Sequence, residues 1–390
     1  MEKQLVLPQR YLDLRKERPR NDAPFPLGGC VWTVNDGKTR FFGGGRPELT
    51  TVSLAQQIDI ITGVNKALLA KSDLLSKAGI VPAPLEGVEM HYPNEINEKN
   101  FSQTVKQLKA GNMVASMVTA NLFFTFPNGS FMSTNPEDRE RAIKWAKAVV
   151  DIAYQFESEL GHLPTDVFWP GGEGSQMHFE LDFVKALHLY AAAMNEVMEY
   201  EYKKGGRMLF AGESKPNEPK DCIILPTSAD FLAVMQGLLD PKFQARFGVN
   251  PETAHEMLAN MSPLNPVAVG LTLGKLFHYH ANWQKGLKWD QDYGVPINLA
   301  MLEVFHHMKE YGFKGFIGLD MQARPESKQV GKVMEYSVMN IRFLEALEKK
   351  VDWGHIDDLR KQGTPEMAEQ YVTMCMIQLM PQGVDAKLFA

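Results

Sequence analysis

Cysteine is scarce in this chain of 390 residues. Cys30, Cys222 and Cys375 are its three cysteines, and their spacing matches neither a zinc motif nor a disulfide framework. Such a low cysteine content is typical of a reducing compartment. Residues 1–20 contain no apolar segment of signal-peptide length, and no later hydrophobic run is long enough to span a bilayer. We therefore expect a cytoplasmic protein without a membrane partner.

An excess of positive charge is also missing. The chain carries 41 Lys and Arg against 47 Asp and Glu, and its net charge of -6 gives no general attraction to phosphate backbones or anionic lipids. Because we also see no local basic stripe, nucleic acid is excluded as an expected partner and a small molecule is favoured. With 44% hydrophobic residues, the chain can bury a large core, either as one barrel-sized domain with an extension or as two ordinary domains.

Short apolar runs alternate along the chain with longer amphipathic segments. The eight candidate strands are LGGCVWTV, EGVEMH, NMVASMVTANL, DVFWPGG, RMLFAGES, FGVNPE, KLFHYHAN and FIGLDM. One helical pattern covers 142–156 after a cap at Asn135 and Pro136, and another covers 181–204 and ends at Gly205. Strands that alternate with helices pair in parallel, and this number of units favours a (β/α)8 TIM barrel of the α/β class over an open sheet.

The pattern changes after Asp320, where helical spacing continues without a further strand. We divide the chain into a barrel catalytic domain with a short N-terminal segment, residues 1–325, and a C-terminal helical extension, residues 326–390. The apolar run MCMIQLM near Cys375 needs cover, so the extension either packs under the barrel or contacts a neighbouring subunit. The extension therefore predicts an oligomerisation arm and a homo-oligomer.

Ionisable residues lie at the ends of the predicted strands, which share one face in a parallel barrel. In chain order they are His91, Glu213, Lys215, Glu252, His255, His280, Asp290, Asp292 and Asp320. So many carboxylates in one place cannot all stay ionised without cations. Two divalent metal ions would balance most of this charge, and oxygen-rich ligands with an occasional imidazole suit Mg²⁺, Mn²⁺ or Co²⁺.

Each motif taken alone has another explanation. Asp290 and Asp292 are typical of a solvated turn, and the spacing of Glu252 and His255 is typical of a helix surface. Lys215 lies in a proline-rich loop where a solvated side chain is common. Structural roles are also the usual ones for histidines and aromatic residues at strand ends. The functional interpretation therefore depends on the shared position of all these residues at one face.

Five segments carry a family resemblance. In this order, FWPGGEG, GESKPNEPKD, FGVNPETAHE, KLFHYHANWQKGLKWDQD and GLDMQARP resemble the motifs of xylose isomerase, a metal-dependent aldose-ketose isomerase with a (β/α)8 barrel. The resemblance is dense over 166–325, looser over 26–130 and negligible in the tail. It implies an intramolecular oxidoreductase that converts D-xylose to D-xylulose, or a related pentose or hexose, by metal-mediated hydride shift. It also implies a homotetramer or a dimer, because such tails embrace a partner subunit in the family.

The resemblance implies a role for each matching residue. One metal would bind Glu213, Glu252 and Asp320, and a second would bind Glu252, His255, Asp290 and Asp292. The catalytic group would comprise His91, Lys215 and Asp290, and the aromatic substrate-binding walls would be Trp32, Phe123 and Trp169. In the family the histidine assists opening of the sugar ring. The lysine hydrogen-bonds the carbonyl end of the open chain.

Three positions depart from the family pattern. His280 stands where an aspartate usually provides the fourth ligand of the first metal, a change that favours Mn²⁺ or Co²⁺ over Mg²⁺ and that resembles rhamnose isomerase. After His91, Asn94 occupies the place of an aspartate, for which Glu95 could substitute. WPGGEG lacks the arginine of the family motif. We expect His278 to be structural.

Other functions compete with this interpretation. A sugar epimerase on a related barrel would need one metal and two acid/base carboxylates, so the pair Asp290 and Asp292 argues against it. A metal-dependent endonuclease would need a basic groove, which the acidic balance disfavours. A catalytically silent metal- or sugar-binding barrel is compatible with the changes at Asn94 and His280, since a fold alone does not establish function.

Overall fold

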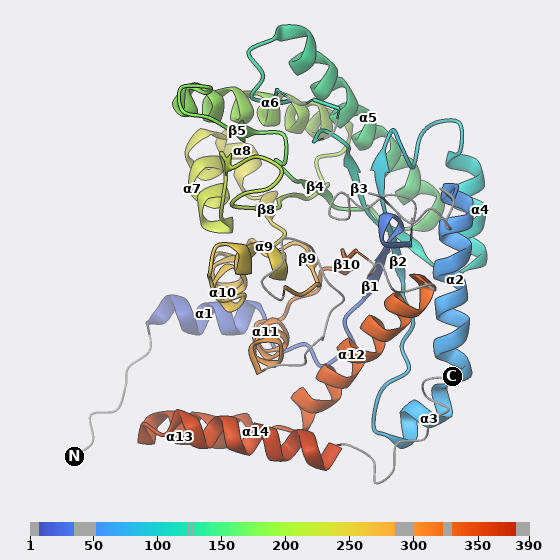
Figure 1. Ribbon diagram of the computed structural model, residues 1–390, viewed down its shortest axis with the longest axis vertical. Coiled ribbons are helices and arrows are strands. Elements are labelled where there is room, and N and C mark those ends of the chain that lie inside the picture. Colours follow the sequence, from blue (N-terminus) through green and yellow to red (C-terminus); the bar gives the residue numbers. More distant parts are fainter. Residues whose placement is uncertain are drawn as a thin grey trace.

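The computed structural model describes residues 8–34, 52–123, 125–126, 128–284, 299–322 and 330–379. Parallel strands surround the centre of the molecule, one in each predicted strand segment (Figure 1). They are β1 (Leu27–Cys30), β2 (Gly87–Tyr92), β3 (Val114–Ala120), β4 (Asp166–Phe168), β6 (Phe210–Gly212), β8 (Phe247–Val249), β9 (Tyr279–His280) and β10 (Ile317–Leu319). They are almost completely buried, as expected of parallel strands covered by helices.

The strands pair in two curved sheets. One sheet has the order β3-β2-β1-β10-β9, and the other has the order β4-β6-β8. Isolated parallel bridges join their edges: Met117 with Thr165 on one side, and both Val249 with Leu276 and Glu252 with His280 on the other. Among the described residues the ladders thus form a curled parallel sheet and not a continuous closed barrel, which confirms the α/β class and only part of the expected (β/α)8 closure.

Helices lie outside the strands (Figure 1). They are α1 (Gln9–Glu17), α2 (Leu54–Ala70), α3 (Ser72–Lys77), α4 (Phe101–Ala110), α5 (Pro136–Leu160), α6 (Phe183–Lys204), α7 (Ser228–Leu238), α8 (Pro241–Gln244), α9 (Thr253–Leu258), α10 (Leu264–Leu273), α11 (Leu299–Glu310), α12 (Val330–Lys350), α13 (Trp353–Gln362) and α14 (Pro365–Leu379). Each of the eight strands is followed by at least one helix, so successive strands run in the same direction and their carboxyl ends share one face.

One predicted helix start and one predicted helix end agree with the structure. Asn135 caps α5 by accepting a hydrogen bond from the backbone N–H of Glu137, and Pro136 occupies the first helical position. Gly205 follows the last residue of α6, as predicted, and Asp182, which was not predicted as a cap, accepts a hydrogen bond from the backbone N–H of Lys185 at its start. The start of α5 and the end of α6 therefore lie at the signals in the sequence.

Two local features differ from the prediction. Residues of the run VWTV form a 3-10 helix, η1 (Val31–Val34), instead of continuing β1. This turn lets the Thr33 hydroxyl donate to the backbone oxygen of Leu319 and brings Trp32 to the ends of the strands. A short antiparallel pair, β5 (Gly174–Ser175) and β7 (Cys222–Ile223), joins the loops after β4 and β6 and was not predicted.

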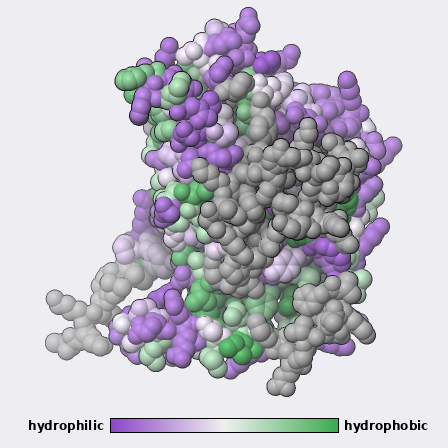
Figure 2. All heavy atoms as spheres, viewed as in Figure 1, coloured by the Kyte–Doolittle hydropathy of each residue, from purple (hydrophilic) through white to green (hydrophobic). Residues whose placement is uncertain are grey.

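The C-terminal helices continue from the barrel layer. α12 packs against α2 and α11, and α13 and α14 extend from its far end (Figure 1). Hydrophobic residues gather on the surface where Figure 1 draws α12 and α14 (Figure 2), and Met374 and Ile377 on α14 are about half exposed. The domain boundary at 325 and the homo-oligomer stay predictions. Among the described helices, none combines the length and apolar character needed to cross a membrane.

A buried ion pair fastens the N-terminal segment to α12. One terminal nitrogen of the guanidinium group, Arg20 Nη2, donates to both oxygens of Glu348 at 2.8 Å, and His306 Nδ1 lies 3.0 Å from the same carboxylate. Burial by itself raises the pKa of Glu348, but the hydrogen bonds from His306 and Arg20 outweigh it and hold this pKa below its ordinary value. Stability from the pair is therefore present above the unfolded pKa of about 4.3 and is lost as the pH falls through the folded pKa.

We expect Arg20→Met to lower the free energy of unfolding at pH 7 by about 2–3 kcal/mol, because Glu348 keeps its burial and loses a charged donor. The difference from the wild type should shrink as the pH falls below the unfolded pKa of about 4.3 toward the lower folded pKa of Glu348. Urea unfolding at pH 7 and pH 3.5 measures this. Arg360→Met is the control, because Arg360 pairs with Asp357 at the exposed surface. An equal loss for Arg20→Met at both pH values would contradict the assignment.

Candidate functional site

Four side chains at the carboxyl ends of the strands form a compact cage. Its members are Glu213 after β6, Glu252 after β8, His280 at the end of β9 and Asp320 after β10, and one donor atom from each lies within 4.8 Å of the others. His280 is central: its Nδ1 is 2.8 Å from Glu213 Oε2, 3.4 Å from Glu252 Oε2 and 3.6 Å from Asp320 Oδ2. The structure therefore brings together four of the residues predicted to bind metal.

A further hydrogen bond orients each carboxylate of the cage. Asn250 Nδ2 donates to Glu213 Oε2 at 2.7 Å, and Trp32 Nε1 donates to Asp320 Oδ1 at 2.7 Å. The Asn282 amide donates to Glu252 and accepts from the backbone N–H of Ala254, so it also fixes the start of α9. These amide and indole partners hold the carboxylates at defined angles without neutralising them.

Charge in the cage is poorly compensated by protein groups. Burial by itself lowers the pKa of His280, but attraction to Glu213 and hydrogen bonds to the surrounding carboxylates raise it well above the ordinary value. Burial by itself raises the pKa of Glu252, but His255 and His280 reverse this and hold it well below the ordinary value. In this form a protonated imidazole occupies the position between the carboxylates that a metal ion would take.

The donor set fits a divalent cation. Three carboxylates and one imidazole nitrogen make a mostly hard, oxygen-rich site of the kind that Mn²⁺, Co²⁺ or Mg²⁺ prefers, and one neutral nitrogen shifts that preference from Mg²⁺ toward the first two. A cation there would displace the imidazole proton and balance the buried negative charge. Metal identity and number are proposals.

The predicted second metal site is only partly placed. His255 Nε2 is 3.0 Å from Glu252 Oε1, and its Nδ1 is 3.0 Å from the backbone oxygen of Ser214. Glu252 thus faces His280 with one oxygen and His255 with the other, as a bridging ligand would. Asp290 and Asp292 lie outside the described residues, so their roles as ligands, and that of Asp290 in catalysis, stay predictions.

Aromatic rings form an arc beside the cage. Ring centroids are 4.1 Å apart for Trp32 and His91, 5.5 Å for His91 and Phe123, and 4.4 Å for Phe123 and Trp169. Trp169 in turn stacks on His255 at 6.4 Å. The predicted substrate walls therefore adjoin one another and reach from Asp320 to His255, which gives the site an apolar side.

The two predicted catalytic residues of the described region join this arc. His91 Nδ1 lies 3.1 Å from Glu95 Oε2, which also accepts from the backbone N–H of His91, so a carboxylate contacts this imidazole although Asn94 stands in the place of the family's aspartate. The Lys215 side chain is fully buried, with Nζ 2.8 Å from Glu218 and 5.5 Å from the centre of the Trp169 ring. A fixed cation thus lies beside the aromatic wall.

Two buried glutamates near the site were missed. Glu173, in WPGGEG, accepts from the backbone N–H groups of Ser130, Phe131 and Met132 at 2.8–3.2 Å and joins the loop after β3 to the loop after β4. Glu89 lies inside β2 and contacts His280. The available signal for Glu89 was an acidic residue within the predicted buried strand EGVEMH.

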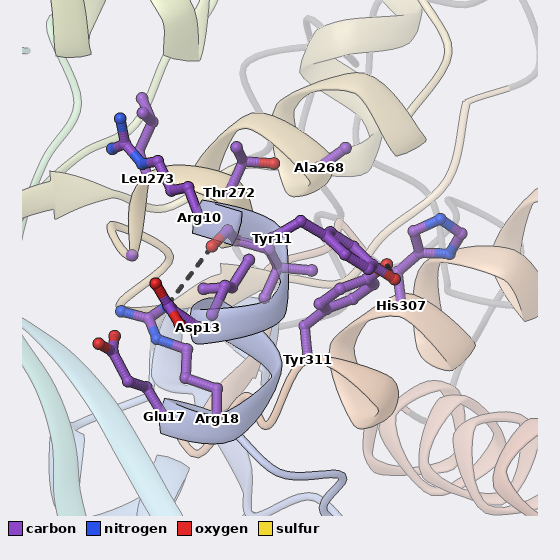
Figure 3. A pocket seen from close by; sticks show the side chains of 13 residues that line it. Arg10, Tyr11, Asp13, Glu17, Arg18, Ala268, Thr272, Leu273, His307 and Tyr311 are labelled. Carbon is purple, nitrogen blue, oxygen red and sulfur yellow. Dashed lines mark hydrogen bonds between the residues drawn. The ribbon is translucent and has the colours of Figure 1, made fainter. Parts of the chain in front are cut away.

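A separate cavity of about 610 Å³ lies between α1, α10 and α11. Figure 3 shows Arg10, Asp13 and Arg18 along one side of it and Tyr11 with Tyr311 on the other. The hydroxyls of these tyrosines are 3.2 Å apart. Its lining contains no member of the cage, and among the described residues no group there could hold a metal ion. The cage is therefore the candidate site.

Comparison with known proteins agrees with this architecture. The sequence model of xylose isomerase-like TIM barrels matches residues 75–340, more than half of the chain. A D-tagatose 3-epimerase-like protein has a similar structure, with 15% identity, a TM-score of 0.51 and coverage of 71% of this chain and 96% of that one. 3-keto-D-glucoside 4-epimerase from E. coli is 12% identical, with a TM-score of 0.50 and coverage of 71% of this chain and 94% of that one. A xylose isomerase domain protein from Planctomyces limnophilus is 13% identical, with a TM-score of 0.50 and coverage of 82% of this chain and 97% of that one. At such identities the likeness concerns the fold.

Proposed function

The chain belongs to the xylose isomerase-like TIM barrel family, and from this premise we propose that it is a metal-dependent sugar isomerase interconverting an aldose and a ketose. The observation that carries the proposal is the cage of Glu213, Glu252, His280 and Asp320 beside the buried Lys215. D-xylose, which would give D-xylulose, is the first candidate substrate, and a related pentose or hexose is the next.

Bound divalent cations would supply Lewis-acid polarisation of adjacent sugar oxygens. Glu213, Glu252 and Asp320 supply the negative charge that holds them, and the aromatic arc excludes water from the reacting carbons. His91 begins the reaction in this proposal. With its Nδ1 hydrogen-bonded to Glu95, its Nε2 would accept the proton of the anomeric hydroxyl and return it to the ring oxygen as the bond from C1 to that oxygen breaks and the C1 carbonyl forms.

Lys215 acts on the open chain in this proposal. Its ammonium group donates a hydrogen bond to the carbonyl oxygen and stabilises the negative charge that develops there as a hydride moves from C2 to C1. The proton of the C2 hydroxyl passes to O1, so C2 becomes the carbonyl carbon as C1 is reduced to the alcohol. Complete burial strengthens this interaction, since a charge acts more strongly where water is excluded. Glu218 fixes the position of the ammonium group from the opposite side.

A sugar epimerase is the second candidate. The described residues provide one cage with two glutamates, Glu213 and Glu252, which is the set that a one-metal epimerase with paired acid/base carboxylates would require. Two proteins of similar fold carry epimerase names. Because Asp290 and Asp292 lie outside the described residues, the geometry of the cage supports both reactions.

Isotope labelling separates the two candidates. We expect a panel of C2-deuterated aldoses incubated with Mn²⁺ to yield a ketose that retains deuterium at C1, because a hydride shift exchanges no hydrogen with water. Mass spectrometry and NMR of the product measure retention. Wash-out of the label would point to proton transfer, and an epimerised product without ketose would favour the epimerase. No product from any sugar would contradict both.

A further inference from the structure

Glu89 is a fully buried carboxylate inside the barrel, one layer below the cage. It lies in the middle of β2, and its backbone position pairs with Cys30 of β1 and Met117 of β3. Its Oε2 lies 3.0 Å from Nε2 of His280, and its Oε1 lies 3.0 Å from Nε2 of His278. The Cys30 thiol donates weakly to Oε2 at 3.4 Å. The carboxylate is thus held from both ends and cannot rotate freely.

Glycines on the two neighbouring strands leave room for this carboxylate. Gly28 of β1 pairs with Gly318 of β10 across the ladder. A Cβ atom at Gly28 would lie 2.5 Å from Glu89 Oε1, and one at Gly318 would lie 2.6 Å from Oε2. Any side chain at either position would collide with Glu89, so the two glycines leave the space that the Glu89 carboxylate fills.

The contact with Glu89 determines which nitrogen of the His280 imidazole carries a proton. A carboxylate accepts hydrogen bonds, so Nε2 of His280 must carry a proton. In a neutral imidazole only one nitrogen is protonated, which leaves the lone pair on Nδ1, the nitrogen that faces Glu213, Glu252 and Asp320. Metal-ligating histidines commonly have such a carboxylate on their other nitrogen.

We propose that Glu89 is a positioning residue that fixes the Nε2–H tautomer of His280 and presents Nδ1 to the cage as a metal ligand. This inference rests on the proposed metal-dependent function. It also explains how a histidine can replace an anionic ligand in a buried site. The negative charge is kept one contact farther away, on Glu89, and reaches the metal through the polarised imidazole.

Zinc titration of the Glu89→Gln variant tests the proposal. We expect the affinity for Zn²⁺, measured by calorimetry, to fall by about 10–100-fold relative to the wild type. Glu348→Gln is the matched control, because Glu348 is also a buried carboxylate hydrogen-bonded to a histidine, His306. Its side-chain partners, His306 and Arg20, are not members of the cage. It should lose stability and keep its affinity. Equal affinity in Glu89→Gln and the wild type would overturn the proposal.

A second measurement uses the wild type and does not depend on folding of the variant. In Zn²⁺-loaded protein with ¹⁵N-labelled histidine, the His280 signal, assigned by its loss in His280→Gln, should show a protonated Nε2 and a metal-bound Nδ1. Coordination through Nε2, or a proton on Nδ1, would overturn the proposal. If the wild type binds no divalent cation at all, the proposed function falls and this inference falls with it, whereas equal binding by Glu89→Gln overturns only the inference.

Discussion

Replacement of Glu252 by glutamine should abolish divalent-metal binding and lower kcat by on the order of 10³-fold. Glu252 faces His255 with one carboxylate oxygen and His280 with the other, and it is completely buried. Glutamine has the same shape but no charge. Its amide would also place a donor where Glu252 accepts a hydrogen bond from Asn282. Calorimetric titration with Mn²⁺ and turnover of the best aldose from the substrate panel measure the two effects.

Glu256→Gln is the control for this variant. Glu256 lies on α9, the short helix that Glu252 directly precedes, and is also buried, but its carboxylate accepts from Ser214 and Ser228 outside the cage. Burial raises the pKa of Glu256 above its ordinary value, whereas the pKa of Glu252 is held below it, so loss of the charge is less costly at Glu256. Metal affinity should be retained. Normal Mn²⁺ affinity in Glu252→Gln would contradict the role assigned to Glu252.

Replacement of Lys215 by methionine should lower kcat by about 10²–10³-fold and leave metal binding intact. Methionine fills a similar volume beside Trp169, but it cannot donate a hydrogen bond to the carbonyl of the open sugar. Metal affinity is expected to persist because Lys215 is not among the four members of the cage. Steady-state kinetics with saturating Mn²⁺, combined with calorimetry, separate the two effects.

Lys309→Met provides a matched control for Lys215→Met. Lys309 is also fully buried and lies 3.5 Å from a glutamate, Glu345, but it packs between the N-terminal segment and α12. Both variants leave a glutamate without its lysine and should lose stability. Only Lys215→Met should reduce the kcat of the protein that remains folded. A similar reduction in both variants would mean that Lys215 acts through stability alone.

Strand positions and helix ends were predictable because they depend on local chemistry. Alternating apolar runs located all eight parallel strands, and Asn135 with Pro136 marked the start of α5 while Gly205 marked the end of α6. Closure of the sheet was not predictable, since β9 contributes a ladder of only two residues and the edges meet only through isolated bridges. The turn at Val31–Val34 depends on a hydrogen bond to Leu319, which is distant in sequence.

The residues of the cage were predictable because each lies at a strand end, where parallel topology brings distant residues together. Their supporting partners were harder to find. Asn250 and Asn282 adjoin cage residues in sequence, but their contacts depend on the register between strands. Glu89 is two residues from His91 and reaches His280 across the barrel interior, so only the spatial order of β2, β1, β10 and β9 shows the contact.

The central claim is that Glu213, Glu252, His280 and Asp320 share a divalent cation. Crystals grown with Mn²⁺ and measured at the manganese absorption edge test it most directly. The account predicts an anomalous peak within coordination distance of one oxygen from each carboxylate and of His280 Nδ1. Ordered density for these four side chains without a peak among them, at saturating Mn²⁺, would contradict it.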